Sequence, residues 1–394
     1  MEADQNKVQS NIRTFIMKYY KALNLPEKYI GIQLKNIGGL SNVNFMATVK
    51  NMSNNQRICM LIFRKFGAAS DCVDHNLETV IMNYLANHGK GPKSLEMNPT
   101  EGYRISEFIP NSMNIPIKDT FNPIYLSQLN KILNVYNMFS YTYKYKIDGY
   151  QITKTPMKNV EKQAKIDISK DQFTNVTEDW VKASIPVFGK FKQKFLETYS
   201  SANTEEWKDM ELVDYYFKNF KDIYTKEFPN SGYLVFSHTD SHRLNFLIRK
   251  DDKKLFILDH EFACLNLPGS DICNYCNESY FNYEPDYYCT LDKTDFDGQY
   301  SKYYLPYIDE FIQNHKFIEK EKGGIEYIKK IRTKSYFIKI HNLINLWYFL
   351  WSLPFVNFDA YHKDHHSEYY FVHAVDRLKL YLIGKKAEEK AMKV

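Results

Sequence analysis

Alternation of apolar and polar residues predicts a sheet in the N-terminal part of the chain. Three runs rich in β-forming residues, 30–37, 43–50 and 57–66, are separated by turn-forming segments at 38–42 and 51–55. Glycine and asparagine in these segments favour tight turns, so the runs are predicted to form an antiparallel meander. A further strand is predicted over 102–109, where Pro110 ends the pattern.

Apolar residues at three- and four-residue spacing predict helices over most of the remaining chain. Helices are predicted over 6–23, 74–87, 122–139, 172–199, 204–228, 292–315, 324–353 and 367–385. Residues 143–170 are rich in lysine and lack a period, so we expect a connection there. The prediction is an α+β chain, with a small antiparallel sheet in residues 1–110 and a larger, mainly helical part in 111–394.

Three further runs, 233–236, 246–248 and 255–258, are apolar and rich in β-forming residues, and the last two flank a polar turn, so they are predicted to form a hairpin. Three polar residues lie on the loop before it and two acidic residues directly after it: His238, Asp240, Asn245, Asp259 and Glu261. Because the ends of adjacent strands lie side by side, the carboxylate and amide oxygens of the four acidic and amide residues would come together. Mg²⁺ prefers such ligands and leaves positions open for phosphate.

The spacing of these residues is typical of phosphoryl transfer. Asp240 follows His238 by two residues, Asn245 comes five residues later, and Asp259 lies 14 residues beyond the Asn. In that template a loop Asp orients the attacking hydroxyl, while the Asn and the later Asp hold metal ions on the phosphates. The alternative is a polar turn containing these residues by chance, but the strands required around a catalytic loop are also predicted here.

Two residues in the N-terminal part fit the same chemistry. Arg64 at the end of the third run and Glu78 in the next helix are placed like the strand cation and helix glutamate of a kinase small lobe. The alternative is an ordinary surface ion pair. The segment 107–110 is where a hinge would offer backbone groups to an adenine edge.

Composition limits the class of protein. A chain of 394 residues is long enough for a two-lobed enzyme, and its net charge is +5. The basic residues are scattered, so no nucleic-acid partner is expected. Residues 1–10 are polar without a secretory signal, and the most apolar stretch, 343–356, is too short to span a bilayer. We therefore expect a cytoplasmic protein without stable membrane insertion.

Cysteine and histidine patterns do not indicate a metal site. The six cysteines include Cys273 and Cys276 but no second pair, so buried thiols in a reducing compartment are favoured over zinc or redox chemistry. A group of histidines towards the C-terminus lacks acidic or thiol partners and is interpreted as a solvated loop that leads into a helix: His362, His365, His366 and His373.

The chain resembles the choline/ethanolamine kinases, which share the bilobal protein-kinase-like and aminoglycoside-phosphotransferase-like fold. The matching segments are 38–42, 61–68, 77–79, 91–93, 107–110, 238–245 and 259–261, followed by Asn266, Gly269, Asp271, Asn274 and Glu278. The resemblance covers about residues 36 to 376, and the segments from 238 onward are specific to the family.

The resemblance implies ATP- and Mg²⁺-dependent phosphorylation of choline to phosphocholine, the first step of phosphatidylcholine synthesis by the CDP-choline route. Residues 1–110 would be the ATP-binding lobe and 111–394 the catalytic lobe. The implied catalytic residues are Asp240, Asn245 and His238. The implied ATP-binding residues are Arg64, Glu78, His88, Glu107, Ile109, His242 and Asp259. The implied metal ligands are Asn245, Asp259 and Glu261.

The acceptor pocket is also implied by the resemblance. A quaternary ammonium group cannot donate hydrogen bonds, so aromatic faces and carboxylates hold it. The implied residues are Asp240, Glu278, Tyr283, Tyr348, Trp351 and Tyr370, with Trp347 as an alternative to Tyr348. The other interpretation of these aromatic residues is ordinary core.

Three classes of function remain open: a small-alcohol kinase, an aminoglycoside phosphotransferase and a nucleotide-binding scaffold. Choline kinase is favoured over ethanolamine kinase because the run 280–283 is aromatic. A phosphotransferase for a polycationic aminoglycoside would need a mainly acidic pocket. A nucleotide-binding pseudokinase scaffold would be expected to lose Asp240, Asn245 or Asp259, and all are present. The family is commonly dimeric, which is the only basis for expecting a homodimer.

Overall fold

The structure is a computed structural model. It describes residues 2–19, 26–38, 42–67, 74–147, 173–198, 214, 219, 224, 234–283, 287–291, 294–320, 323–358 and 365–391. The described residues group into two compact units. The first holds those up to Asn114 together with Asn245–Phe262, and the second holds the others.

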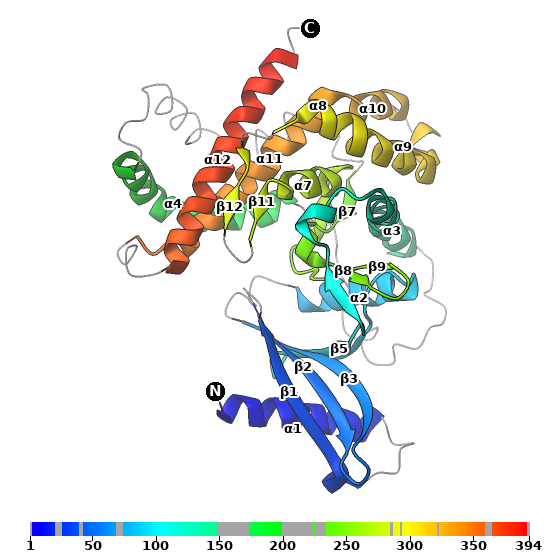
Figure 1. The fold of residues 1–394 in the computed structure, drawn as a ribbon. Coiled ribbons are helices and arrows are strands. Elements are labelled where there is room, and N and C mark those ends of the chain that lie inside the picture. Colours follow the sequence, from blue (N-terminus) through cyan, green and yellow to red (C-terminus); the bar gives the residue numbers. More distant parts are fainter. Residues whose placement is uncertain are drawn as a thin grey trace. The chain divides into compact units, whose positions relative to one another are not determined.

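The first unit is built on a five-stranded antiparallel sheet (Figure 1). Its strands, in spatial order, are β1 (Ile30–Gly38), β2 (Val43–Asn51), β3 (Gln56–Lys65), β5 (Tyr103–Glu107) and β4 (Ser94–Asn98). The predicted meander and the predicted strand at 102–109 are confirmed, and β4 was not predicted. Helix α1 (Glu2–Tyr19) lies along this sheet, with Ile12 and Phe15 in one core with Phe45 and Phe63.

Helix α2 (His75–Asn87) follows β3, close to the predicted 74–87. Its N-terminus is capped by the Asp74 side chain, which accepts hydrogen bonds from the backbone N–H groups of Asn76 and Leu77. Leu77 and Leu85 are buried, and so is Glu78 in the first turn. The helix therefore directs a carboxylate into the interior of the first unit.

The predicted hairpin is confirmed and belongs to the first unit. Strand β8 (Phe246–Arg249) pairs with β9 (Leu255–Ile257), and β6 (Ser112–Asn114) pairs with the other edge of β8. Through β6 the hairpin is hydrogen-bonded to the segment that follows the first sheet. The lobe boundary expected after residue 110 stays a prediction. Residues 245–262, which were expected in the C-terminal lobe, belong to the same compact unit as the N-terminal part.

The second unit is mainly helical. Its described long helices are α3 (Pro123–Ile147), α4 (Phe173–Thr198), α7 (Ser270–Glu278), α9 (Leu305–Asn314), α10 (Gly324–Ile331), α11 (Lys334–Ser352) and α12 (His365–Ala391). Two short antiparallel pairs accompany them: β7 (Val235–Ser237) with β10 (Cys264–Asn266), and β11 (Phe281–Asn282) with β12 (Tyr288–Cys289). Helix α11 packs against both α7 and α12 (Figure 1). The predicted α+β class is confirmed.

Some predicted helices differ in detail. The helix expected over 292–315 consists of α8 (Phe296–Gln299), a π-helical turn at Tyr300–Tyr304, and α9. The helix expected over 324–353 is two helices, because the Thr333 hydroxyl accepts a hydrogen bond from the Tyr336 N–H and caps α11. The start of the connection expected at 143–170 is wrong, because residues 143–147 belong to α3. The rest of that segment up to residue 170, most of the helix expected at 204–228, and residues 20–23 lie outside the described residues.

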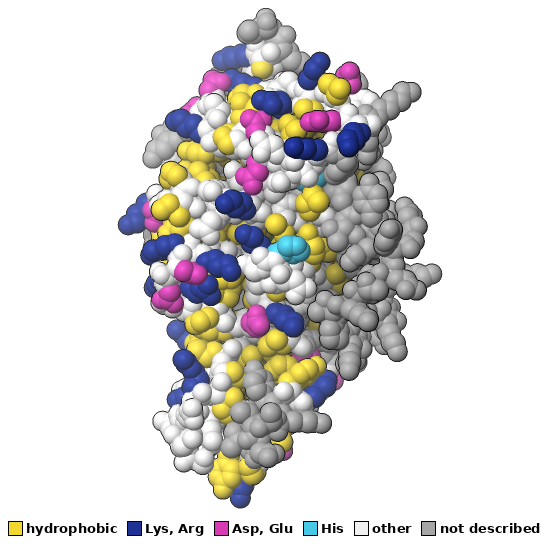
Figure 2. Space-filling model, turned by 90° about the vertical axis from the view of Figure 1, so that its right-hand side faces the viewer, with side chains coloured by type: hydrophobic (Ala, Val, Ile, Leu, Met, Phe, Trp, Pro, Cys, Tyr) yellow, Lys and Arg dark blue, Asp and Glu magenta, His cyan; other side chains and the backbone are white. Residues whose placement is uncertain are grey.

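None of the helices in the described parts of the chain is both long and apolar enough to cross a membrane. On the face shown in Figure 2, Lys and Arg side chains are interspersed with Asp and Glu. The coloured residues of this face therefore present no single basic block of the kind that nucleic-acid binding favours.

Candidate active site

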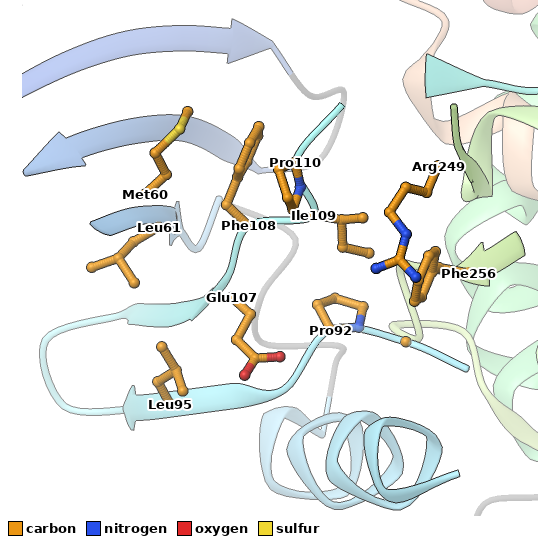
Figure 3. Close-up of a pocket in the computed structure, with 11 residues that line it drawn as sticks. Met60, Leu61, Pro92, Leu95, Glu107, Phe108, Ile109, Pro110, Arg249 and Phe256 are labelled. Carbon is orange, nitrogen blue, oxygen red and sulfur yellow. The ribbon is translucent and has the colours of Figure 1, made fainter. Parts of the chain in front are cut away.

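The first unit contains a cavity of about 350 Å³. It is lined by Met60, Leu61, Gly91, Pro92, Leu95, Glu107, Phe108, Ile109, Pro110, Arg249 and Phe256. Figure 3 shows Leu61 and Leu95 on strands of the sheet, and Ile109 beside Arg249 and Phe256 of the hairpin. The volume and the apolar walls suit a small planar ligand. The two predicted adenine-contacting residues, Glu107 and Ile109, both line this cavity.

Glu107 also fixes the shape of the cavity. Its backbone N–H donates to the Lys93 carbonyl at 3.0 Å, and its side-chain Oε2 accepts from the Lys93 N–H at 3.0 Å. His88, also predicted to lie near the nucleotide, is exposed at the end of α2, where a ring nitrogen contacts the Tyr84 carbonyl at 2.8 Å.

The predicted Arg64–Glu78 pair is present, but a second arginine is the main partner of the glutamate. Arg64 Nη1 lies 3.3 Å from Glu78 Oε1. Arg104 on β5 contacts both oxygens of Glu78, with Nη1 2.7 Å from Oε2 and Nη2 2.8 Å from Oε1. Burial opposes ionisation of Glu78, but Arg104, with His75 and Arg64, holds the pKa of this carboxyl well below its usual range.

The buried Arg104 side chain therefore neutralises most of the charge of Glu78. Arg64 is held by other groups as well, since its Nε donates to Asn44 Oδ1 at 3.1 Å and its Nη1 contacts Asp259 Oδ1 at 2.8 Å. A guanidinium that does not have to neutralise the buried glutamate alone can bind a phosphate oxygen. Sequence analysis missed Arg104, although an arginine in the buried strand pattern of 103–107 is the signal that marks it.

Replacing Arg104 by methionine is expected to destabilise the protein by about 3–5 kcal/mol, because it leaves a buried carboxylate without its main partner. Urea unfolding of both proteins measures the difference. Arg332→Met is the matched control: its pair with Asp309 is half exposed and should contribute at most about 1 kcal/mol. Equal, small losses in the two variants would show that Glu78 does not depend on Arg104.

The hairpin positions the predicted metal ligands of the first unit. Asn245 directly precedes β8, and its carbonyl accepts from the Leu258 N–H at 2.8 Å, which places it beside the residue before Asp259. Asp259 has φ +60°, a backbone conformation that turns the chain sharply after β9. Glu261 Oε2 accepts from Asn42 Nδ2 at 2.9 Å. Two carboxylates and an amide oxygen suit Mg²⁺, whose remaining positions water and phosphate would fill.

In the second unit, the loop after β7 is held by Asp271, at the start of α7. The Asp271 carboxylate accepts from the backbone N–H groups of His238 and Thr239, at 3.1 and 3.0 Å. Thr239 has φ +68°, so the clamp stabilises a strained turn. His238 is buried, and its Nδ1 accepts from the Asp240 N–H at 3.3 Å. His238 therefore contacts the backbone of Asp240 from the interior, and its catalytic role stays a prediction.

Asp240 carries the best-defined side chain of this loop. Its Oδ1 accepts from the Tyr348 hydroxyl at 2.6 Å, and its Oδ2 lies 3.5 Å from His242 Nε2. Burial tends to raise its pKa, but His242, the Tyr348 hydroxyl and His238 together lower it below the ordinary value. Asp240 is therefore ionised at neutral pH. His242, predicted to lie near the nucleotide, contacts the Asp240 carboxylate of its own unit.

A buried arginine that sequence analysis missed lies among the predicted acceptor residues. The Arg377 guanidinium carbon lies 3.8 Å from the centroid of the Phe281 ring and 4.0 Å from that of Tyr348. Arg377 forms an ion pair with Glu278 Oε1, and Tyr283 donates to Glu278 Oε2 at 2.6 Å. The carboxylate expected to attract an ammonium group thus already neutralises an internal cation.

The other predicted pocket residues lie in an aromatic cluster on α11 and α12. Trp351 is half-buried, 5.6 Å from Tyr370 and 6.4 Å from Tyr348 between ring centroids. Of the two alternatives for this helix turn, Tyr348 reaches Asp240, whereas Trp347 is almost fully buried. His373, grouped in the sequence with a solvated loop that leads into a helix, lies within α12 itself and is buried in this cluster.

The two cysteines that were weighed as a metal or redox pair lie in the protein interior. Cys273 and Cys276 are fully buried on α7, and burial raises the pKa of both thiols. Among the residues described, no group of three or more His, Cys, Asp or Glu side chains could hold a metal ion. His362 and the side chains of His365 and His366 lie outside the described residues.

Residues 34–382 match the family model of the choline/ethanolamine kinases. A probable ethanolamine kinase from Arabidopsis thaliana is 24% identical over 312 residues, which cover 79% of this chain and 70% of the relative.

Among solved structures, choline kinase from Cryptosporidium parvum is similar with a TM-score of 0.62 and 16% identity, over 96% of each chain. Plasmodium vivax ethanolamine kinase gives a TM-score of 0.52 and 17% identity, over 92% of this chain and 85% of the other. At these identities the likeness shows the fold alone, and it confirms the predicted protein-kinase-like fold.

Proposed function

Because the chain belongs to the choline/ethanolamine kinase family, we propose that it transfers the γ-phosphoryl group of ATP to the hydroxyl of choline with Mg²⁺. The product would be phosphocholine. Membership makes the chain a kinase of this family, and the choice of choline is the proposal. The expectations of a cytoplasmic location and of a homodimer stay predictions from the sequence and the resemblance.

The engagement of Glu278 is the observation that supports choline. One of its oxygens is paired with Arg377 and the other accepts from Tyr283. The primary ammonium of ethanolamine needs up to three hydrogen-bond acceptors. The trimethylammonium of choline needs none and is attracted by aromatic faces. Half-buried rings such as Trp351 and Tyr283 supply those faces, so this cluster offers more to choline than to ethanolamine.

The predicted site residues would then have the following chemical roles. The cavity beside Glu107 and Ile109 would take the adenine ring, and Arg64 would steady the phosphates. Asn245, Asp259 and Glu261 would hold Mg²⁺, which offsets the charge of the transferred group. Asp240 would align the choline hydroxyl and accept its proton. The aromatic cluster would hold the methylated nitrogen while Glu278 and Arg377 keep the rings in place.

Ethanolamine remains the alternative substrate, since the Arabidopsis thaliana relative is named as a probable ethanolamine kinase. An aminoglycoside is disfavoured, because Glu278 is already neutralised within the protein. The pseudokinase scaffold is disfavoured by the presence of Asp240, Asn245 and Asp259.

The purified full chain with Mg²⁺-ATP tests the proposal when ADP release is measured with choline, ethanolamine and an aminoglycoside as separate acceptors. We expect the highest kcat/KM with choline. A higher kcat/KM with ethanolamine would reverse the choice of substrate. Absence of turnover with all three acceptors, by a protein that binds ATP, would favour the scaffold.

Replacing Trp351 by alanine is expected to raise the KM for choline about 2- to 30-fold, while the KM values for ethanolamine and ATP change little. The reason is that a well-placed ring contributes about 0.5–2 kcal/mol to binding a methylated cation and much less to a hydrated primary ammonium. Steady-state kinetics with each acceptor measures the three constants.

Trp351→Phe is the control for this variant, because it keeps an aromatic face at the same position and should retain most of the affinity for choline. Equal increases for choline and ethanolamine in Trp351→Ala would indicate a packing role. A selective loss with ethanolamine would contradict the assignment of this ring to choline.

A further inference from the structure

Tyr348 was predicted to hold the ammonium group of the substrate, but its hydroxyl contacts two polar side chains of the protein. Its hydroxyl lies 2.6 Å from Asp240 Oδ1 and 3.1 Å from Asn274 Nδ2. Asn274 Nδ2 also donates to the Thr239 carbonyl at 2.9 Å, which fixes the orientation of that amide. An amide nitrogen only donates, so the phenol oxygen accepts from Asn274 and its own proton is directed to Asp240.

A buried cation, Arg377, packs against one face of the Tyr348 ring. Arg377 lies 4.0 Å from its centroid, and Phe281 covers the guanidinium at 3.8 Å. The guanidinium is bound in turn by Glu278 and, at 3.0 Å, by the Tyr283 hydroxyl. This face of the Tyr348 ring is therefore occupied by a protein cation and is not available to a substrate ammonium.

A directed chain of hydrogen bonds also holds the Tyr348 backbone. Arg377 Nε donates to His373 Nε2 at 3.1 Å, which leaves the proton of the neutral imidazole on Nδ1. Burial, with the charge of Arg377, keeps the pKa of His373 well below its usual value, so the ring stays neutral. His373 Nδ1 then donates to Ser352 Oγ at 2.7 Å, and Ser352 donates to the Tyr348 carbonyl at 2.7 Å.

We propose that Tyr348 is a positioning residue for the catalytic carboxylate, and that its hydroxyl holds Asp240 Oδ1 so that Oδ2 is the oxygen that receives the acceptor alcohol. This inference rests on the proposed function, since it needs Asp240 to act on an alcohol. It changes the role expected from the sequence. Tyr348 binds the Asp240 carboxylate and not the substrate ammonium, and Arg377 holds the Tyr348 ring in position.

The proposal has a signature in the pH dependence. The titratable groups of the second unit that interact with Asp240 include His238, His242, Tyr348 and Tyr369. A hydrogen bond donated to a carboxylate favours its ionised form, so loss of the Tyr348 hydroxyl raises the pKa of Asp240. The acid limb of kcat/KM would then move to higher pH, because the base becomes protonated earlier as the pH falls.

Tyr348→Phe tests this, because it keeps the ring over Arg377 and removes only the hydroxyl. We expect kcat to fall about 10- to 100-fold, as for loss of a hydrogen bond to a charged group, with little change in the acceptor KM. The acid limb of the pH profile should move upward. The measurements use whichever acceptor the wild-type enzyme turns over best, and a melting curve verifies that the variant is folded.

Tyr287→Phe is the matched control, because its hydroxyl donates to a different carboxylate of the same cluster, Asp376 Oδ2, at 3.0 Å. Its acid limb should coincide with that of the wild type. A Tyr348→Phe enzyme with unchanged kcat and pH profile, or with only a raised KM, would overturn the positioning role. Absence of turnover by the wild-type enzyme would instead overturn the proposed function, so the two failures are distinguishable.

Discussion

Asp240→Asn is expected to lower kcat by about 10² to 10⁴, because it removes the group that aligns the acceptor hydroxyl and takes its proton. Asparagine keeps the shape of the side chain and can still accept the hydrogen bond from Tyr348. The loop, held by Asp271 through the N–H groups of His238 and Thr239, should therefore keep its conformation. Turnover at saturating ATP and acceptor measures the effect.

Two further measurements separate chemistry from folding in that variant. The cavity proposed for the nucleotide is lined entirely by other residues, so calorimetry should show unchanged binding of an ATP analogue. Asp309→Asn, a half-exposed aspartate paired with Arg332, is the matched control and should retain wild-type turnover. If Asp240→Asn kept near-wild-type turnover, the assignment of the catalytic carboxylate would be wrong.

The elements that the sequence predicts well are those with a long and regular pattern. The meander of β1, β2 and β3 has strands of nine or ten residues with an alternating pattern and turns rich in Gly and Asn. The hairpin of β8 and β9 is marked by a polar turn between two apolar runs. Both signals are local, so no knowledge of tertiary contacts is needed to find them.

The elements that it misses are short or depend on a single cap. Strands β6 and β10 have three residues each, too few to establish a period. Helix α10 ends at Ile331, and the Thr333 hydroxyl caps the start of α11 within a continuous apolar pattern. A lone threonine in such a pattern does not reveal that its side chain turns back onto the backbone.

The candidate site divides in the same way. The spacing of Asp240, Asn245 and Asp259 is a local signal and predicts the chemistry of each. The pairing of Glu278 with Arg377 joins residues 99 positions apart, and no local pattern announces it. One indirect signal existed: Arg377 lies among the buried positions 371, 374, 375 and 378 of α12, and a charge on such a face requires a partner.

The second large effect is expected at Asp259, whose backbone decides which substitution is informative. Its φ of +60° is unfavourable for most residues with a side chain, and asparagine tolerates it better than alanine does. Asp259→Asn therefore removes the charge while keeping the turn after β9. Arg64 loses the negative charge of its partner at 2.8 Å but retains Asn44 and Glu78, so the first unit should remain folded.

With Asp259→Asn we expect kcat at fixed Mg²⁺ to fall about 100-fold or more and half-saturation to require more Mg²⁺. A carboxylate within about 4 Å of a cation contributes on the order of 4 kcal/mol in partly buried surroundings, and about 1.4 kcal/mol corresponds to tenfold in rate. Titrating Mg²⁺ at constant ATP measures both effects. Asp252→Asn, an exposed aspartate on the same hairpin that pairs with Arg249, should reproduce the wild-type curve. Superimposable curves for Asp259→Asn and the wild type would mean that Asp259 only holds Arg64, and that the metal depends on other ligands.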